Sequence, residues 1–176
     1  MAMGWADKFN LDLMVQLQKR GYEISIATTL PGNYQWYREF AALTPDIFIL
    51  PHFLRIIDYP RFLRYLIQSR QIDVVFISNS EMGYKLLPYL RSRCPEVTFV
   101  DFCHMEEEYW NNGGYPRLSV GYQELLDLTI VASQHLKDWM VQRGAVPEGI
   151  EVCYINVDPE KFAPNQDLRS KERAKW

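Results

Sequence analysis

The sequence predicts an α/β fold: a doubly wound, mostly parallel, Rossmann-like sheet with helices on both faces. Six short apolar runs rich in β-branched residues alternate along the chain with helical patterns. Runs such as residues 73–77 are almost continuously apolar, which is typical of strands that helices cover on both faces. Repeated strand and helix units with right-handed crossovers then give a parallel sheet whose ligands bind at the carboxyl ends of the strands.

The first element is an amphipathic helix that ends at Arg20. Apolar residues recur at three- and four-residue spacing from Ala6 to Leu17, and Gly21 follows the last turn. The apolar runs predict strands at residues 22–29, 46–50, 73–78, 97–102, 128–132 and 150–155. Helical spacing predicts helices at residues 35–43, 60–70, 83–93, 118–127 and 133–143. The periodic pattern then stops, which predicts a domain over residues 1–157 and a linker over residues 158–176.

Composition excludes several classes of protein. The 176 residues carry a net charge of −3, which argues against a nucleic-acid partner. The three cysteines have no CxxC or Cys/His ligand spacing, so we expect no disulfide framework, no metal site and a cytoplasmic location. The glycines form neither the dinucleotide-binding nor the P-loop motif, and we expect no bound cofactor. No apolar run is long enough to span a bilayer.

Candidate site residues follow two strands of the predicted sheet. His104 comes directly after one strand, where a ligand at the carboxyl edge would lie, and Ser78 and Asn79 end another. Residues 104–117 combine an imidazole, carboxylates, amides, large aromatics and an arginine, the mixture that carbohydrate sites use. A solvated loop with an acidic helix N-terminus is the alternative interpretation. His52 and His135 are interpreted as surface residues outside the site.

Residues 52–70 carry four arginines against a single acid, interleaved with aromatic residues. A basic, aromatic, amphipathic helix can lie on an anionic membrane, so this segment predicts peripheral contact with the inner face of a membrane. The alternative is an ordinary crossover helix with its apolar stripe on the sheet.

Several motifs resemble those of family-four glycosyltransferases, and they occur in the family's order. The opening helix followed by Arg20-Gly21-Tyr22-Glu23-Ile24 resembles the start of that family. Later segments are similar to its successive strand-end motifs, namely residues 73–80, 100–104, 127–133 and 154–164. The resemblance implies one half of a two-domain GT-B enzyme that transfers a sugar from a nucleotide-sugar donor to a glycan, lipid or polysaccharide acceptor with retention of configuration.

Individual roles follow from the same resemblance. Gly4 matches the first glycine of the loop near the donor diphosphate, and His104 matches a catalytic histidine near the transferred sugar. Acceptor recognition, which this family places in the N-terminal half, is assigned to Ser78, Asn79, Glu106, Trp110, Asn111 and Arg117. Two departures are Trp5, where a second glycine is expected, and the absence of a pair of glutamates eight positions apart.

These features lead to further expectations. The donor would bind mainly to a second domain, so this chain alone is expected to be inactive. The family's first strand has no counterpart before Gly4, and we expect the resulting gap to close by direct pairing of strands 22–29 and 73–78 or by self-association. A stand-alone α/β binding or scaffold module and another nucleotide-sugar enzyme, such as an epimerase, remain the alternatives.

Overall fold

The structure is a computed structural model that describes residues 5–32, 34–155, 159, 163–164 and 166–175. Its α-helices are α1 (Trp5–Lys19), α2 (Tyr37–Leu43), α3 (Tyr59–Ser69), α4 (Glu81–Arg93), α5 (Gly114–Tyr122), α6 (Gln134–Val141) and α7 (Gln166–Arg173). Its strands are β1 (Ile26–Thr28), β2 (Ile47–Ile49), β3 (Val74–Ser78), β4 (Thr98–Cys103), β5 (Leu128–Val131) and β6 (Ile150–Val152). Short 3₁₀ helices are η1 (Leu50–His52), η2 (Ile56–Asp58), η3 (Gln123–Leu125) and η4 (Pro147–Gly149).

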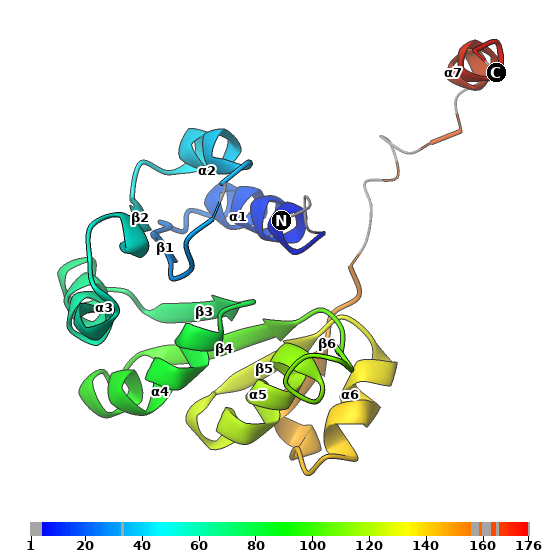
Figure 1. The fold of residues 1–176 in the computed structure, drawn as a ribbon. Helices are drawn as coiled ribbons and strands as arrows, with labels where there is room; N and C mark the ends of the chain where they lie inside the picture. The colour runs from blue at the N-terminus through cyan, green and yellow to red at the C-terminus, as the bar shows by residue number, and fades with distance from the viewer. Residues whose placement is uncertain (1–4, 33, 156–158, 160–162, 165, 176) are drawn as a thin grey trace.

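The strands form two parallel sheets, which confirms the predicted α/β class. Four strands pair in the order β3-β4-β5-β6, with Ser78 opposite Phe102 in the register. Strands β1 and β2 pair separately, with Ile26 opposite Ile47. In Figure 1, α1 and α2 lie above the strands while α4 and α5 lie below them, so helices occupy both sides. The fold is therefore Rossmann-like.

The predicted direct pairing of the strands around residues 22–29 and 73–78 is wrong. Within the described residues, β1 pairs only with β2 and β3 pairs only with β4. One face of β3 is also less covered than its apolar sequence predicts, since Val74 is 51% exposed and Phe76 is 36% exposed. Polar contacts hold the two sheets together instead: Thr29 contacts Ser80 at one edge, and other side chains bridge the opposite edge.

At the edge where the strands begin, which we call the amino edge, one carboxylate connects the two sheets. Asp46, which precedes β2, accepts a hydrogen bond from Ser25 and three from Nε and Nη2 of Arg70, with Arg70 Nη2 at 2.8 Å from Oδ1. The hydrogen bond from Arg70 holds the pKa of Asp46 below its ordinary value. Because Arg70 directly follows α3, this contact places the start of β3 next to the start of β2. All strands therefore present their carboxyl ends at the opposite edge.

The core has two buried clusters. One joins α4 to β3 and β4 and includes Tyr84, Leu87 and Phe99, and the other joins α6 to β5 and β6. Helix α3 buries Tyr59, Leu66 and Ile67, so its apolar stripe packs on the fold as the crossover-helix interpretation expects. No helix within the described residues is long and apolar enough to cross a membrane.

Two segments differ from their predicted structure. Helix α5 begins at Gly114 instead of at residue 118, because a turn with positive φ at Gly113 and Gly114 starts it early. The predicted linker contains α7, which lies apart from the sheets in Figure 1. Its sequence, QDLRSKER, has only one apolar residue, so apolar periodicity could not reveal this helix.

Candidate functional site

The candidate site lies at the carboxyl ends of β1, β3 and β4. Thr29 and Ser80, which follow β1 and β3, are 3.0 Å apart at their hydroxyl oxygens. Ser80 also accepts a hydrogen bond from the backbone N–H of Gly83 at 3.0 Å and so caps the N-terminus of α4. Helix α1 reaches the same edge, where the ring of Phe9 stacks on Phe102 of β4 at 4.2 Å between centroids. Three strand ends and one helix therefore meet here.

His104 lies in the middle of this edge. Its imidazole contacts the ring of Phe9 edge-on at 5.2 Å and the ring of Phe102 at 4.7 Å. Burial lowers the pKa of His104, so the ring is neutral at pH 7. Its Nε2 atom is buried and has no hydrogen-bond partner among the described residues. A neutral imidazole with a free nitrogen can donate to or accept from a ligand hydroxyl.

Three more polar atoms, on the elements that meet at this edge, are buried without a partner among the described residues. They are Ser78 Oγ at the end of β3, Thr28 Oγ1 at the end of β1 and Asn10 Oδ1 on α1. Buried polar atoms are almost always paired, so each of these atoms needs a hydrogen-bond partner that the described residues do not supply. We define the edge cluster as Asn10, Thr28, Ser78 and His104. Ser78 and His104 were predicted from the sequence as site residues, whereas Asn10 and Thr28 were not.

Asn79 and Gly4 were also expected at this site, and Asp7 lies close to Gly4 in the sequence. Asn79 has a positive φ of 47° and joins β3 to the capping Ser80. Asp7 lies in the first turn of α1, where burial raises its pKa. Gly4, the expected diphosphate residue, lies outside the described residues, and so do residues 156–158 of the last motif. The tight turn after β3 uses Asn79 because a short amide side chain tolerates this backbone conformation.

The loop after His104 is tied down mainly by its own backbone and by α6. Glu106 Oε1 lies 3.0 Å from Nε2 of His135, and its own backbone N–H together with His135 lowers the pKa of Glu106. Trp110 packs edge-on against Tyr115 at 4.7 Å, and its carbonyl accepts hydrogen bonds from Gly113 and Gly114. His135, interpreted from sequence as an unrelated surface residue, is thus a contact of this loop.

Glycine is required at the turn that starts α5. A Cβ atom on Gly113 would lie 2.3 Å from the Trp139 ring, and φ at Gly113 is +129°. A Cβ atom on Gly114 would lie 2.9 Å from the side chain of Glu107. The other expected acceptor residues, Asn111 and Arg117, are exposed around this turn. The structure therefore separates the expected residues into an inner cluster around His104 and an outer group on the loop.

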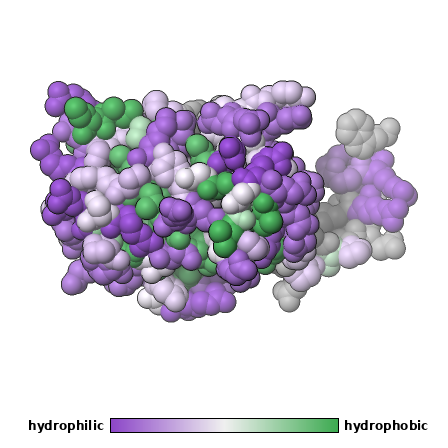
Figure 2. Space-filling view, turned by 90° about the horizontal axis from the view of Figure 1, so that it is seen from below, coloured by the Kyte–Doolittle hydropathy of each residue, from purple (hydrophilic) through white to green (hydrophobic). Residues whose placement is uncertain are grey.

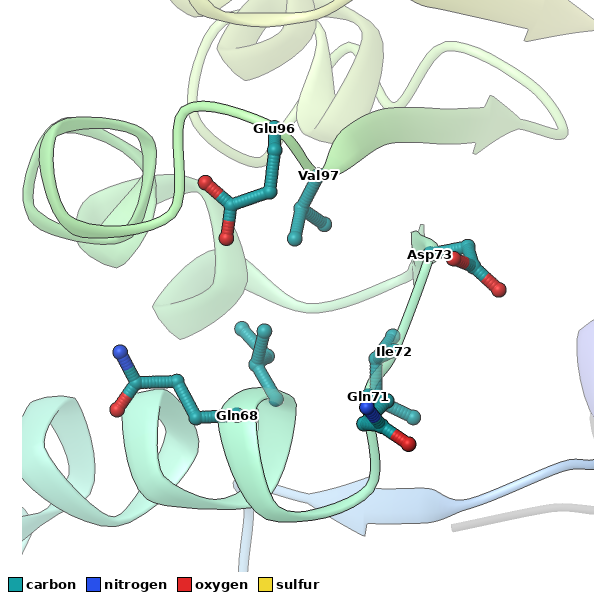
Figure 3. Close-up of a pocket in the computed structure, with 7 residues that line it drawn as sticks. Gln68, Gln71, Ile72, Asp73, Glu96 and Val97 are labelled. Atoms are coloured by element: carbon teal, nitrogen blue, oxygen red, sulfur yellow. The ribbon is translucent and has the colours of Figure 1, made fainter.

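A cavity of about 320 Å³ lies at the opposite, amino edge of the sheet (Figure 3). It is lined by Ile67, Gln68, Gln71, Ile72, Asp73, Glu96 and Val97. Asp73 and Glu96 precede β3 and β4, whereas ligands of doubly wound sheets bind at the carboxyl ends. Among the described residues, no group of three His, Cys, Asp or Glu side chains is placed to hold a metal ion. We therefore assign no chemistry to this cavity.

Comparison with known proteins supports the fold. No curated protein matches the sequence. Among solved structures, Anabaena HepE in complex with UDP matches with a TM-score of 0.69 and 16% identity, over 98% of this chain and 46% of that chain. HepE in complex with UDP-glucose matches with a TM-score of 0.62 and 14% identity, over 98% of this chain and 46% of that chain. The chain thus spans about half the length of these structures, and the likeness shows the fold.

The family is settled by sequence. The family model described as Glycosyltransferase Family 4 matches residues 6–161, which takes in both sheets, the edge cluster and the loop that follows His104. Since this match covers most of the chain, the protein belongs to Glycosyltransferase Family 4.

Proposed function

We propose that this chain is the acceptor-side half of a glycosyltransferase that uses a nucleotide-sugar donor and retains the configuration of the transferred sugar. The edge cluster carries the proposal. It holds two hydroxyls, an amide oxygen and a neutral imidazole nitrogen, all buried and without a partner among the described residues. Sugars present many hydroxyls at close spacing, and a site of this kind pairs with several of them at once.

The proposed reaction breaks the bond between the anomeric carbon and the donor diphosphate. The acceptor hydroxyl oxygen bonds to that carbon, its proton passes to the departing diphosphate, and the nucleoside diphosphate leaves. His104 holds a sugar hydroxyl by a hydrogen bond rather than acting as a charged acid, because burial keeps its pKa low. Glu106, Trp110, Asn111 and Arg117 are proposed to contact the acceptor from the loop, and Gly4 the diphosphate.

A donor and acceptor screen tests this proposal. We expect the 176-residue chain to show no turnover by itself, because donor and acceptor must be held together and positioning contributes about 7–11 kcal/mol to lowering a barrier. In a longer protein that joins this chain to a donor-binding domain, we expect His104→Ala to lower kcat/KM at least about tenfold. His52→Ala is the matched control and should leave kcat/KM unchanged, since the His52 ring packs on Tyr34 and not on Phe9 or Phe102, the rings that contact His104.

Several outcomes would contradict the proposal. Turnover by the 176-residue chain alone would show that a second domain is not needed. Release of an altered sugar nucleotide without any acceptor would indicate an epimerase. Binding of a sugar without turnover in any longer protein would indicate a binding module. A product with inverted configuration would contradict the proposed retention of configuration but not the proposed sugar transfer.

We also propose self-association and a cytoplasmic location. Unpaired strand edges recruit partners, and β1 and β3 each have one unpaired edge within the described residues. Sedimentation velocity tests this, and a monomer at all concentrations would contradict it. Cys94, Cys103 and Cys153 are free thiols, which suits a reducing compartment. Fractionation of cells that express the tagged protein tests the location.

A further inference from the structure

An exposed apolar turn lies between two arginines just before α3. Ile56 and Ile57, in η2, are 63% and 75% exposed, and Phe53 nearby is 53% exposed. Among the large hydrophobic side chains of the described residues, only Tyr109 is more exposed than Ile57. Single exposed apolar residues are common, but three within five positions are not explained by packing. We call Phe53, Arg55, Ile56, Ile57 and Arg61 the basic tip.

The arginines of the basic tip share one acid. Arg55 Nε lies 3.3 Å from Oδ2 of Asp58, and Arg61 Nη2 lies 3.0 Å from Oδ1 of the same carboxylate. The side chains of Arg55 and Arg61 are 84% and 83% exposed, and each uses a single nitrogen in this contact. A guanidinium has five N–H donors, so most donors of both groups stay available. Between residues 47 and 72, Asp58 is the only acid, and the tip keeps a net positive charge.

Phe53 of the basic tip packs on aromatic rings of the fold. Phe62 of α3 contacts Phe53 at 5.3 Å and Phe48 of β2 at 5.4 Å. The buried stripe of α3, including Tyr59 and Leu66, is already packed against the fold. The exposed aliphatic side chains therefore belong to the turn, while Tyr65 is the large hydrophobic residue that α3 itself exposes. Figure 2 shows one group of hydrophobic side chains at the upper left of the lower face and others scattered over its middle, and α3 lies on the left in Figure 1.

We propose that the basic tip binds the surface of an anionic lipid bilayer. Ile56 and Ile57 would enter the boundary between headgroups and acyl chains, while Arg55 and Arg61 pair with lipid phosphates. Charge supports this assignment, since the tip is positive on a chain whose net charge is −3. Size supports it too: a few side chains do not reach the roughly 1,000 Å² that a specific protein interface buries. The inference does not depend on the transferase proposal.

Vesicle co-sedimentation of the 176-residue chain tests the proposal. We expect binding to phosphatidylcholine vesicles that contain phosphatidylglycerol, little binding to pure phosphatidylcholine, and weaker binding at high salt. Arg55→Gln with Arg61→Gln should lower the partition coefficient about 30-fold, since each arginine near an anionic surface contributes about one kcal/mol. Ile56→Ser with Ile57→Ser should lower the partition coefficient at least about tenfold. The control pair, Arg93→Gln with Val146→Ser, changes an exposed arginine and an exposed apolar residue elsewhere and should bind as the parent does.

A second measurement reports insertion directly. Cys153 is exposed, so a Cys153→Ser background allows an environment-sensitive fluorophore to be attached at Ile57→Cys. The dye emission should shift to the blue with anionic vesicles, and a dye at Val146→Cys should not shift. Unfolding midpoints check that all variants fold. No binding of the parent to anionic vesicles, equal binding to neutral vesicles, or full binding by both tip variants would overturn the proposal. So would loss of self-association in the Ile56→Ser/Ile57→Ser variant without loss of vesicle binding, which would indicate a contact between copies of the chain.

Discussion

Replacing Tyr84 with Phe probes a buried carboxylate beneath the edge cluster. The Tyr84 hydroxyl donates a hydrogen bond to Oδ2 of Asp101 at 2.7 Å, and both side chains are fully buried. Burial raises the pKa of Asp101, and the hydrogen bond from Tyr84 is the strongest influence that lowers it. Without this donor, the charged form of Asp101 loses a partner inside the protein. We therefore expect Tyr84→Phe to raise the pKa of Asp101 in the folded state further.

The sign of the pH dependence follows from linkage. A group whose pKa is higher in the folded state than in the unfolded state stabilises the fold below its unfolded pKa, and this stabilisation is lost as pH rises through the folded pKa. Near the ordinary Asp pKa of 3.8, Asp101 is protonated in the fold, and Tyr84→Phe should cost about 0.5–1.5 kcal/mol, as for a neutral hydrogen bond. At a higher pH, above the folded pKa of Asp101, the folded protein holds the charge, and the cost of Tyr84→Phe should rise to about 1.5–3 kcal/mol.

Urea unfolding at the two pH values and constant ionic strength measures this difference. Tyr109→Phe is the control, since Tyr109 is 99% exposed and loss of its hydroxyl should change the free energy of unfolding by less than about 0.5 kcal/mol. In an Asp101→Asn background, which cannot ionise, the cost of Tyr84→Phe should become independent of pH. An equal cost at both pH values in the parent background would refute the reasoning.

Three other predictions concern the cap of α4, the turn before α5 and the exposure of the cysteines. Ser80→Ala removes the cap of α4 and should lower the free energy of unfolding by about 1–2 kcal/mol, measured by urea unfolding. Gly113→Ala places a methyl group 2.3 Å from the Trp139 ring and should lower it by about 2–4 kcal/mol, because overpacking and an unfavourable φ add. In the native state one thiol, that of exposed Cys153, should react rapidly with a disulfide reagent, and all three should react in urea.

For each of these three predictions, one result would contradict the expected effect. Ser80→Ala with parental stability would mean that Gly83 N–H finds another acceptor. Gly113→Ala with parental stability would mean that the Trp139 ring moves away freely. Rapid native reaction of two or more thiols would contradict the burial of Cys94 and Cys103, whose pKa values burial raises.

The succession of helices and strands along the chain was predictable because helix and strand periods differ and the chain alternates between them regularly. Strands β3 to β6 were each placed within a few residues, since a buried parallel strand must be apolar throughout. Strand β1 is shorter than the run at 22–29, because pairing with the three residues of β2 limits its length. Which strands pair across the gap was not predictable. That choice depends on side-chain contacts between distant segments, such as Arg70 with Asp46, which no local pattern encodes.

The candidate site was predictable in part for a similar reason. His104 and Ser78 end apolar runs, and polar residues at the ends of parallel strands must gather at one edge. Asn10 and Thr28 were not predictable, because one lies within a helix and the other within a run read as strand. Their importance appears only once burial and missing hydrogen-bond partners are known. A polar atom inside a helix or strand can therefore be identified as a site candidate only when its burial and its hydrogen-bond partners are known.

The position of the basic tip bears on which acceptor class is favoured. The chain leaves the carboxyl end of β2 through η1 and η2 before α3 returns to the amino edge, so the tip follows the carboxyl end of β2. A bilayer bound at the tip would hold the whole chain at the membrane surface. Of the glycan, lipid and polysaccharide acceptors, a lipid-linked one would then meet the cluster at high local concentration. Turnover of a longer protein, measured with the same acceptor in detergent and in anionic vesicles, would separate these classes. A lipid-linked acceptor predicts faster turnover on vesicles and loss of this advantage in the Arg55→Gln/Arg61→Gln variant. A soluble glycan acceptor predicts equal rates in detergent and on vesicles.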